Sequence, residues 1–209
     1  RERNLTLTTV GDDAPWPVYG DALRLRQVLA GVLPTNEEGE NYLVPDNKRT
    51  EVLLEVLEQT TGKVIIWTSF VSPLRNLAKE INRVHGAGTV VPFYGGIKAE
   101  DRQRYVVDFQ DPQSAVRFFV GQVKTGGLGL TLTAADTVVY HDHDWSREAR
   151  LQSEDRAHRI GQTKSVTYVD LVAPGTVDET IRAAVNAKSE LADLVTGDGW
   201  RRLLTGGAF

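Results

Sequence analysis

The sequence predicts an α/β fold in which a parallel β-sheet carries helices on both faces. Its 209 residues suffice for one such domain or two small ones. Short apolar runs of the buried-strand type, such as residues 64–67, alternate with amphipathic stretches of ten or more residues. Parallel neighbours need a long crossover, usually a helix, so this alternation favours a parallel sheet.

The first 60 residues are expected to form a helical lead-in. Residues 23–31 give a short amphipathic helix that ends at a glycine. Residues 33–47 contain prolines, asparagines and a glycine, which is typical of a loop. Residues 48–59 place their apolar side chains on one helical face and predict a second helix.

The rest of the chain predicts one sheet domain, residues 61–175, and a final helix with a tail, residues 176–209. The expected strands are residues 64–67, 89–93, 115–120, 137–141 and 166–172. The expected helices are residues 73–84, 99–109, 147–158 and 177–195. A glycine-rich loop at residues 126–129 is expected to lead through a short helix into the fourth strand.

Composition excludes several classes of protein. No apolar run approaches the roughly 18 residues of a membrane span, and the N-terminus has no signal-peptide core. The absence of cysteine excludes disulfides, thiolate metal sites and cysteine nucleophiles, and fits an intracellular location. The formal net charge of -4 requires any nucleic-acid contact to use a local basic patch. A chain without methionine that opens at Arg1 is expected to be a piece of a longer protein.

The phosphate-binding loop of nucleotide enzymes, GxxxxGK[ST], is absent. The only Gly-Lys pair, Gly62-Lys63, is followed by valine and has no glycine five residues earlier. The Gly126–Gly129 loop lacks the third glycine of the dinucleotide fingerprint, because Leu132 stands there. That loop fits either a ligand contact or a tight strand-to-helix turn.

A sharper feature is the segment QSEDRAHRIGQ, which starts at Gln152. Arg156 and Arg159 are three residues apart and share one side of the expected helix, with Gln152 one turn earlier. Two permanently charged, bidentate guanidiniums suit a polyphosphate whose terminal oxygens gain charge during transfer. The alternative is a solvated helix in which neighbouring carboxylates balance the arginines.

The run His141-Asp-His-Asp144 has two histidines and two carboxylates, a set that can ligate a transition metal. A third ligand on the same face would be needed, so we expect no metal site and a strand end that steers the chain towards Trp145. The strand-like segments also contain aromatic side chains that are expected to pack in the core, Trp67, Phe70, Phe118 and Phe119.

Six segments, taken in order, resemble the motifs of the Swi/Snf-type chromatin remodellers and their bacterial and viral relatives, within the superfamily-two translocases. The segment from Gln152 resembles motif VI. The other five are residues 63–70 (motif IV), Tyr94–Gly96 with Arg102 and Phe109, residues 125–136 (motif V), Asp144-Trp145, and residues 175–179. This resemblance implies the second RecA-like lobe of a two-lobe ATPase motor, with the final helix bracing onto the first lobe.

The resemblance implies that ATP lies between the two lobes. The first lobe, upstream of this sequence, would supply the phosphate loop and hold most of the ATP and Mg²⁺. Arg156 and Arg159 would act as arginine fingers, with Gln152 and the backbone of Gly127 and Gly129 lining the same cleft. No metal would be held by this lobe itself.

The resemblance also implies a grip on double-stranded DNA. Phosphates of the duplex would contact Thr68 and Ser69 at the end of motif IV, Gly96, and Lys124 at the entry of motif V. The partners expected are therefore duplex DNA and the first lobe of the same protein, with no membrane.

Some residues depart from the family pattern. Thr125 and Thr131 stand where alanine and asparagine are usual, and Gln122-Val123 replaces Ser-Thr near the expected DNA contacts. The linker insertions of large eukaryotic remodellers are absent, which favours a compact bacterial or phage protein. Two other functions stay open, a strand-separating helicase lobe, which would need a wedge element, and a non-enzymatic DNA- or protein-binding module. The residues upstream of Arg1 would discriminate between them.

Overall fold

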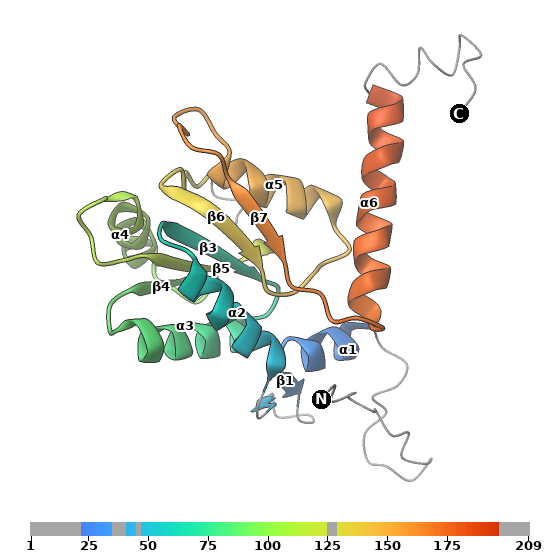
Figure 1. Cartoon of the computed structure of the whole chain (residues 1–209), viewed down its shortest axis with the longest axis horizontal. Coiled ribbons are helices and arrows are strands. Elements are labelled where there is room, and N and C mark those ends of the chain that lie inside the picture. Colours follow the sequence, from blue (N-terminus) through green and yellow to red (C-terminus); the bar gives the residue numbers. More distant parts are fainter. Residues whose placement is uncertain (1–21, 35–40, 45–46, 125–128, 197–209) are drawn as a thin grey trace.

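The computed structural model describes residues 22–34, 41–44, 47–124 and 129–196. Its main sheet has five parallel strands in the order β4-β5-β3-β6-β7 (Figure 1). The strands are β3 (Lys63–Thr68), β4 (Val90–Phe93), β5 (Phe118–Gln122), β6 (Ala135–Tyr140) and β7 (Thr167–Asp170). Each overlaps one strand expected from the sequence, so the parallel RecA-like α/β fold is confirmed.

The central strand β3 is apolar on both faces, which is the pattern of a strand covered on both sides. Val64 and Ile66 pack into one hydrophobic cluster, while Ile65 and Trp67 pack into another. All four side chains are at most 1% exposed. Core packing is thereby confirmed for Trp67, Phe118 and Phe119. It is wrong for Phe70, which lies after β3, is half-buried and has the Arg26 guanidinium 5.3 Å from its ring centroid.

Four helices cover the two faces of the sheet. Leu53 and Leu74 belong to the first cluster, and Phe109 and Ala157 to the second. The helices are α2 (Lys48–Gln59) and α3 (Val71–His85) on the first face, and α4 (Ala99–Gln110) and α5 (Arg147–Ala157) on the second. In Figure 1, α2 and α3 lie below the sheet and α5 lies above it.

All five strands run the same way, so their carboxyl ends share one side of the sheet, called here the carboxyl edge. Ser69 follows β3 at this edge, and Lys124 follows β5. The opposite side, the amino edge, holds the start of each strand, including Ala135 of β6. The carboxyl end of α5 lies at the amino edge, because the next loop bonds Ala135 there.

Residues 33–47 contain more than the loop that their composition predicts. They hold a two-stranded antiparallel sheet, β1 (Val32–Pro34) paired with β2 (Asn41–Leu43). The backbone N–H of Val44 also donates to the carbonyl of Gly31 at 2.9 Å. These strands are three residues long, too short for an alternation pattern to reveal them.

The short helix expected before β6 is wrong, since residues 129–134 form no helix. Their backbone groups bond to other parts of the chain. The N–H of Leu132 donates to the carbonyl of Arg156 at 2.9 Å, and the N–H of Ala134 donates to Gln110 Oε1 at 2.8 Å. These bonds hold the segment against α4 and α5, and it ends in a turn in which the N–H of Ala135 donates to the carbonyl of Leu132 at 3.2 Å.

The helical lead-in and the final helix are tied together by a buried ion pair. Arg49 of α2 pairs with Asp178 in the first turn of α6 (Val177–Thr196). Arg49 also donates to the carbonyl of His141 at 2.9 Å, and α1 (Ala22–Leu29) contacts α6. Within the described ranges, no helix has the length and apolar character that crossing a bilayer requires.

Candidate functional site

One open groove brings together four residues that the sequence predicts to bind a nucleotide. Gly129, Gln152, Arg156 and Arg159 line it, and its volume is about 720 Å³. Gly127, the fifth predicted residue, lies outside the described residues. We call this hollow the α5 groove, because its lining comes from the second half of α5 and the loop that follows. Its other lining residues include Asp155, His158, Gln162 and Lys164.

The α5 groove is cationic. Arg156, Arg159 and Lys164 line it with one carboxylate, Asp155, and Lys164 also pairs with Asp136 outside the lining at 3.5 Å. Burial lowers the pKa of Arg156, the charge of Arg159 lowers it further, and Asp155 acts in the opposite direction. A guanidinium remains charged at neutral pH even so, and two of them side by side favour an anion in contact with both.

The guanidinium of Arg159 lies on the end of the glycine-rich segment. Its Nη1 donates to the carbonyl of Gly129 and to Thr131 Oγ1, both at 3.1 Å. The side chain stays exposed to solvent. Thr131, one of the departures from the family pattern, thus helps to orient this arginine.

Helix α5 presents Gln152 and Arg156 one turn apart on the groove. The hydroxyl of Ser146 caps the helix by accepting from the N–H of Ala149 at 3.1 Å. Gln152 Nε2 donates to Glu148 Oε1 at 3.0 Å, one turn towards the start of the helix. Gln152 and Arg156 therefore share a helix face, as predicted, and Gln152 is anchored along that face. The expectation that Arg159 lies on the same helix is wrong, because α5 ends at Ala157 and Arg159 belongs to the loop that follows.

The residues predicted to contact DNA lie at the carboxyl edge, across the sheet from the α5 groove. Lys124 and Gly96 are exposed and Ser69 is half-buried. Thr68 is 0% exposed, and its hydroxyl donates to the carboxylate of Asp142. The expected DNA contact is thereby corrected for the side chain of Thr68, which is a core contact in this structure.

Asp142 fixes the chain where it leaves β3. Its two carboxylate oxygens also accept from the backbone N–H of Ser69 at 3.0 and 3.1 Å. Burial alone would raise the pKa of Asp142, but His141, Ser69 and Thr68 lower it to about 2. The carboxylate is therefore ionised at neutral pH and holds Ser69 in place.

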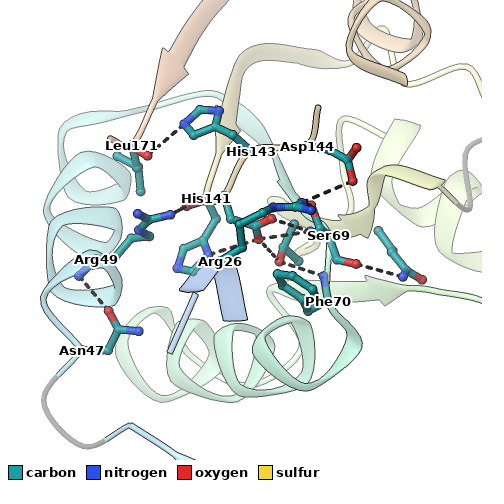
Figure 2. Close-up of polar contacts among 12 residues, drawn as sticks. Arg26, Asn47, Arg49, Ser69, Phe70, His141, His143, Asp144 and Leu171 are labelled. Carbon is teal, nitrogen blue, oxygen red and sulfur yellow. Dashed lines mark hydrogen bonds and ion pairs between the residues drawn. The ribbon is translucent and has the colours of Figure 1, made fainter. Parts of the chain in front are cut away.

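Asp144 collects two cations at the carboxyl edge. Its Oδ2 lies 3.2 Å from Arg26 Nη2 and 3.4 Å from Lys124 Nζ. Figure 2 shows the guanidinium of Arg26 between Asp144 and Ser69, whose hydroxyl accepts from it at 3.0 Å. Burial favours a raised pKa for Asp144, yet Arg26, the N–H of Ser146 and Lys124 together lower it.

Gly96 lies in a turn that three side chains shape. A Cβ at Gly96 would meet the ring of Tyr94 at 2.8 Å, whereas a Cβ at Gly95 would meet nothing within 4 Å. Arg75 Nε donates to the hydroxyl of Tyr94 at 3.1 Å and its guanidinium lies over that ring. Arg102 donates to the carbonyl of Gly95 at 2.8 Å. The turn therefore has a fixed shape, and its backbone is open to solvent at Gly96.

The His141–Asp144 run serves the fold in the described residues. His143 Nε2 lies 3.0 Å from the carbonyl of Leu171, and the two carboxylates bind the groups described above. Where the chain is described, no three side chains of the metal-ligating types are grouped to hold an ion.

Three contributors escaped the sequence reasoning as functional residues. Arg26 lies 118 residues from its partner Asp144, and nothing in its local sequence signals that contact. The sequence presents Asp142 only as a candidate metal ligand. Gln162 is the last residue of the segment that resembles motif VI, and nothing in the sequence signals the backbone bonds that its side chain makes.

Comparison with known proteins gives consistent matches. Residues 48–161 match the family model described as "Helicase conserved C-terminal domain". The human chromatin-remodeling ATPase INO80 is 34% identical over 164 residues, which cover 77% of this chain and 10% of that protein. The INO80 ATPase of Arabidopsis thaliana is 32% identical over 198 residues, 90% of this chain and 12% of that protein. The chain thus spans about a tenth of the length of these relatives.

A solved structure agrees with these sequence matches. The crystal structure of the C-terminal part of the Fun30 ATPase domain superimposes with a TM-score of 0.60 at 25% identity. The match covers 66% of this chain and 44% of that one. Because the family model covers more than half of the sequence, the chain belongs to the helicase conserved C-terminal domain family and is a RecA-like lobe of the Swi/Snf type.

Proposed function

We propose that this chain is the second motor lobe of an ATP-dependent translocase that moves along double-stranded DNA. The α5 groove carries this proposal, because it gathers Arg156, Arg159, Gln152 and Gly129 on one cationic surface. The likeness to chromatin-remodelling ATPases supports it. ATP and Mg²⁺ would be held mainly by a first lobe, because this sequence contains no phosphate-binding loop.

The α5 groove fits a polyphosphate. Its guanidiniums are fixed donors that match the oxygens of a phosphoryl group in pairs. Arg156 and Arg159 would stabilise the charge that spreads over the transferring γ-phosphoryl, an effect of roughly 10³ to 10⁵ in rate in related enzymes. The same burial that lowers the pKa of Arg156 strengthens its attraction for a phosphate.

The carboxyl edge would hold the DNA backbone. Lys124 offers an ammonium, Ser69 a hydroxyl, and Gly96 an exposed stretch of backbone, all of which bind phosphate oxygens. Such contacts read no bases, so movement along the duplex should tolerate any sequence. Asp144 keeps Lys124 in place and competes with phosphate for it.

In this proposal each of three segments of the chain has its own role. Residues 1–60 form a lead-in on the lobe, residues 61–175 form the lobe, and residues 176–209 brace onto the first lobe. The buried Arg49–Asp178 pair supports a fixed attachment of the lead-in to the start of the brace. A motor of this kind acts where the DNA is, in the nucleus of a eukaryote or the nucleoid of a bacterium.

The test uses the two-lobed protein that carries this chain. Arg156→Ala and Arg159→Ala should each lower the kcat of DNA-stimulated ATP hydrolysis by about 100-fold or more, while DNA affinity stays near that of the parent. Arg→Lys at either position should not restore the rate, because a point charge lacks the planar fork. Arg104→Ala is the matched control, since Arg104 is an exposed α4 residue paired with Asp101. Normal turnover in both alanine variants of the groove would refute the assignment.

A further inference from the structure

The side-chain amide of Gln162 joins four backbone groups where three segments of the chain meet. Its Nε2 lies 2.9 Å from the carbonyl oxygen of Ala135 and 3.1 Å from those of Thr133 and Ala157, so its two hydrogens are shared among three acceptors. Its Oε1 accepts from the N–H of Lys164 at 3.0 Å. One amide therefore connects the end of α5, the start of β6 and the segment before it.

This junction closes the loop that carries Arg159. The backbone N–H of Gln162 donates to the carbonyl of Arg159 at 2.9 Å. Between them, Gly161 has a φ of +105°, a conformation that side chains other than glycine's rarely allow. The turn is thus set by its backbone, and the Gln162 amide fastens it to the sheet.

The other side of the loop is fastened to the same segment. The carbonyl of Arg156 accepts from the N–H of Leu132 at 2.9 Å, and Thr131, the residue before, accepts from the Arg159 guanidinium. Arg159 therefore has its backbone held from both sides and its guanidinium held at the tip. The side chain of Arg159 is exposed, but the segments that hold it cannot move apart without breaking the hydrogen bonds of Gln162.

We propose that Gln162 is a positioning residue for Arg159, because its amide sets where the guanidinium lies in the α5 groove. Catalytic hydrogen-bond donors must be placed closely, and a misplacement of about 1 Å costs about 100-fold in rate. Since Arg159 acts on ATP only under the function proposed above, this role rests on that function.

The partners of Gln162 account for the choice of glutamine. Three carbonyls require a donor and one N–H requires an acceptor, and a primary amide supplies both ends. Gln162→Glu keeps the size and the acceptor but turns a second oxygen towards the three carbonyls. Gln162→Ala leaves those carbonyls without this donor. Gln162→Asn keeps the amide, which is one methylene too short to reach all four groups.

The experiment measures steady-state ATP hydrolysis by the two-lobed protein with saturating duplex DNA. Gln162→Ala and Gln162→Glu should each lower kcat by about 10- to 100-fold, with little change in KM for ATP. Gln162→Asn should lower kcat less, because it keeps the amide and perturbs the fold less. Gln113→Ala is the matched control, because Gln113 is an exposed glutamine in the turn between α4 and β5, outside the segment that holds the Arg159 loop. Its kcat should stay near that of the parent.

A double-mutant cycle separates positioning from a merely structural role. In an Arg159→Ala background, Gln162→Ala should lower kcat no further, because the residue it positions is gone. An equal fall with and without Arg159, or a normal kcat in Gln162→Ala, would overturn the role of Gln162 alone. A normal kcat in Arg159→Ala itself would overturn the proposed function together with it.

Discussion

The carboxylate of Asp144 and the guanidinium of Arg26 lie 3.2 Å apart at the carboxyl edge, although 118 residues separate them in the chain. Both side chains are largely buried, at 14% and 8% exposure. The pair attaches α1 to the loop after β6, and Asp144 adds Lys124 from the loop after β5. The lead-in is thereby joined to the surface proposed to hold DNA.

Asp144→Asn should destabilise the chain by about 3 kcal/mol, because it leaves the buried charge of Arg26 without its carboxylate. The free energy of unfolding in urea measures this. Glu80→Gln, which breaks an exposed pair with Arg83, is the control and should change stability by less than about 0.5 kcal/mol. A loss no larger than that of the control would show that α1 is held by other contacts.

Asp142 predicts a loss of stability in acid. The pKa of this carboxyl is 3.8 in the unfolded chain and about 2 in the folded one, so the unfolded chain binds the proton first as the pH falls. The stabilisation is therefore present above about pH 4 and is lost as the pH falls towards 2, by about 2 kcal/mol. Urea unfolding between pH 2 and 6 should show a flatter profile for Asp142→Asn. An unchanged slope would assign the acid sensitivity to other groups.

Lys124→Ala in the two-lobed protein should weaken binding to all duplex sequences alike. The slope of log affinity against log salt should fall by about one unit, because one fewer phosphate is neutralised. DNA-stimulated turnover should fall with it, while the rate without DNA stays the same. Lys48→Ala, on an exposed pair in α2, serves as the control. A salt series with unchanged slope and affinity would mean that Lys124 serves only Asp144.

Gly96→Ala and Gly95→Ala form a matched pair at the neighbouring turn. A methyl at position 96 meets the Tyr94 ring, which Arg75 holds, whereas one at position 95 meets open space. Gly96→Ala should therefore weaken DNA binding several-fold while Gly95→Ala changes it little. Equal effects of the two changes would indicate that the shape of this turn is not what DNA contacts.

The isolated 209-residue chain should hydrolyse no ATP above background, with or without duplex DNA. Neither a phosphate-binding loop nor its Mg²⁺-binding hydroxyl is present in the sequence. Phosphate release by the purified chain is the measurement, with the Arg156→Ala, Arg159→Ala chain as background. Release well above that background would contradict the division of the ATP site between two lobes.

The sheet was predictable because its strands are short apolar runs between amphipathic helices, as β3 illustrates. The α5 groove was predictable for a different reason. Residues 152–157 lie in one helix, so helix periodicity puts Gln152 and Arg156 on one side, whereas Arg159 lies two residues past the end of α5 and reaches the groove from the loop that follows. Residue spacing alone does not predict that these residues share a surface with Gly129, and that prediction depended on the family resemblance.

Contacts between distant segments were beyond this reasoning. The pattern of β3 gives no sign that Asp142, two residues after β6, accepts from the hydroxyl of Thr68, so the burial of this side chain could not be predicted. The path of residues 129–134 was also missed, because side chains of Gln110 and Gln162 supply the partners that helical bonds would have supplied. A polar side chain that bonds to backbone groups far away in the chain produces no periodic pattern in the sequence.

Helix α5 is capped by Ser146, beside the carboxyl edge, and ends at the loop of Arg159 on the amino edge. Its 11 residues span about 16 Å. Under the proposed function, a rod of this kind would keep the spacing between the residues that contact DNA and the Arg159 loop constant. A displacement at the α5 groove would then reach the carboxyl edge as a movement of the whole lobe and not as a bend within it.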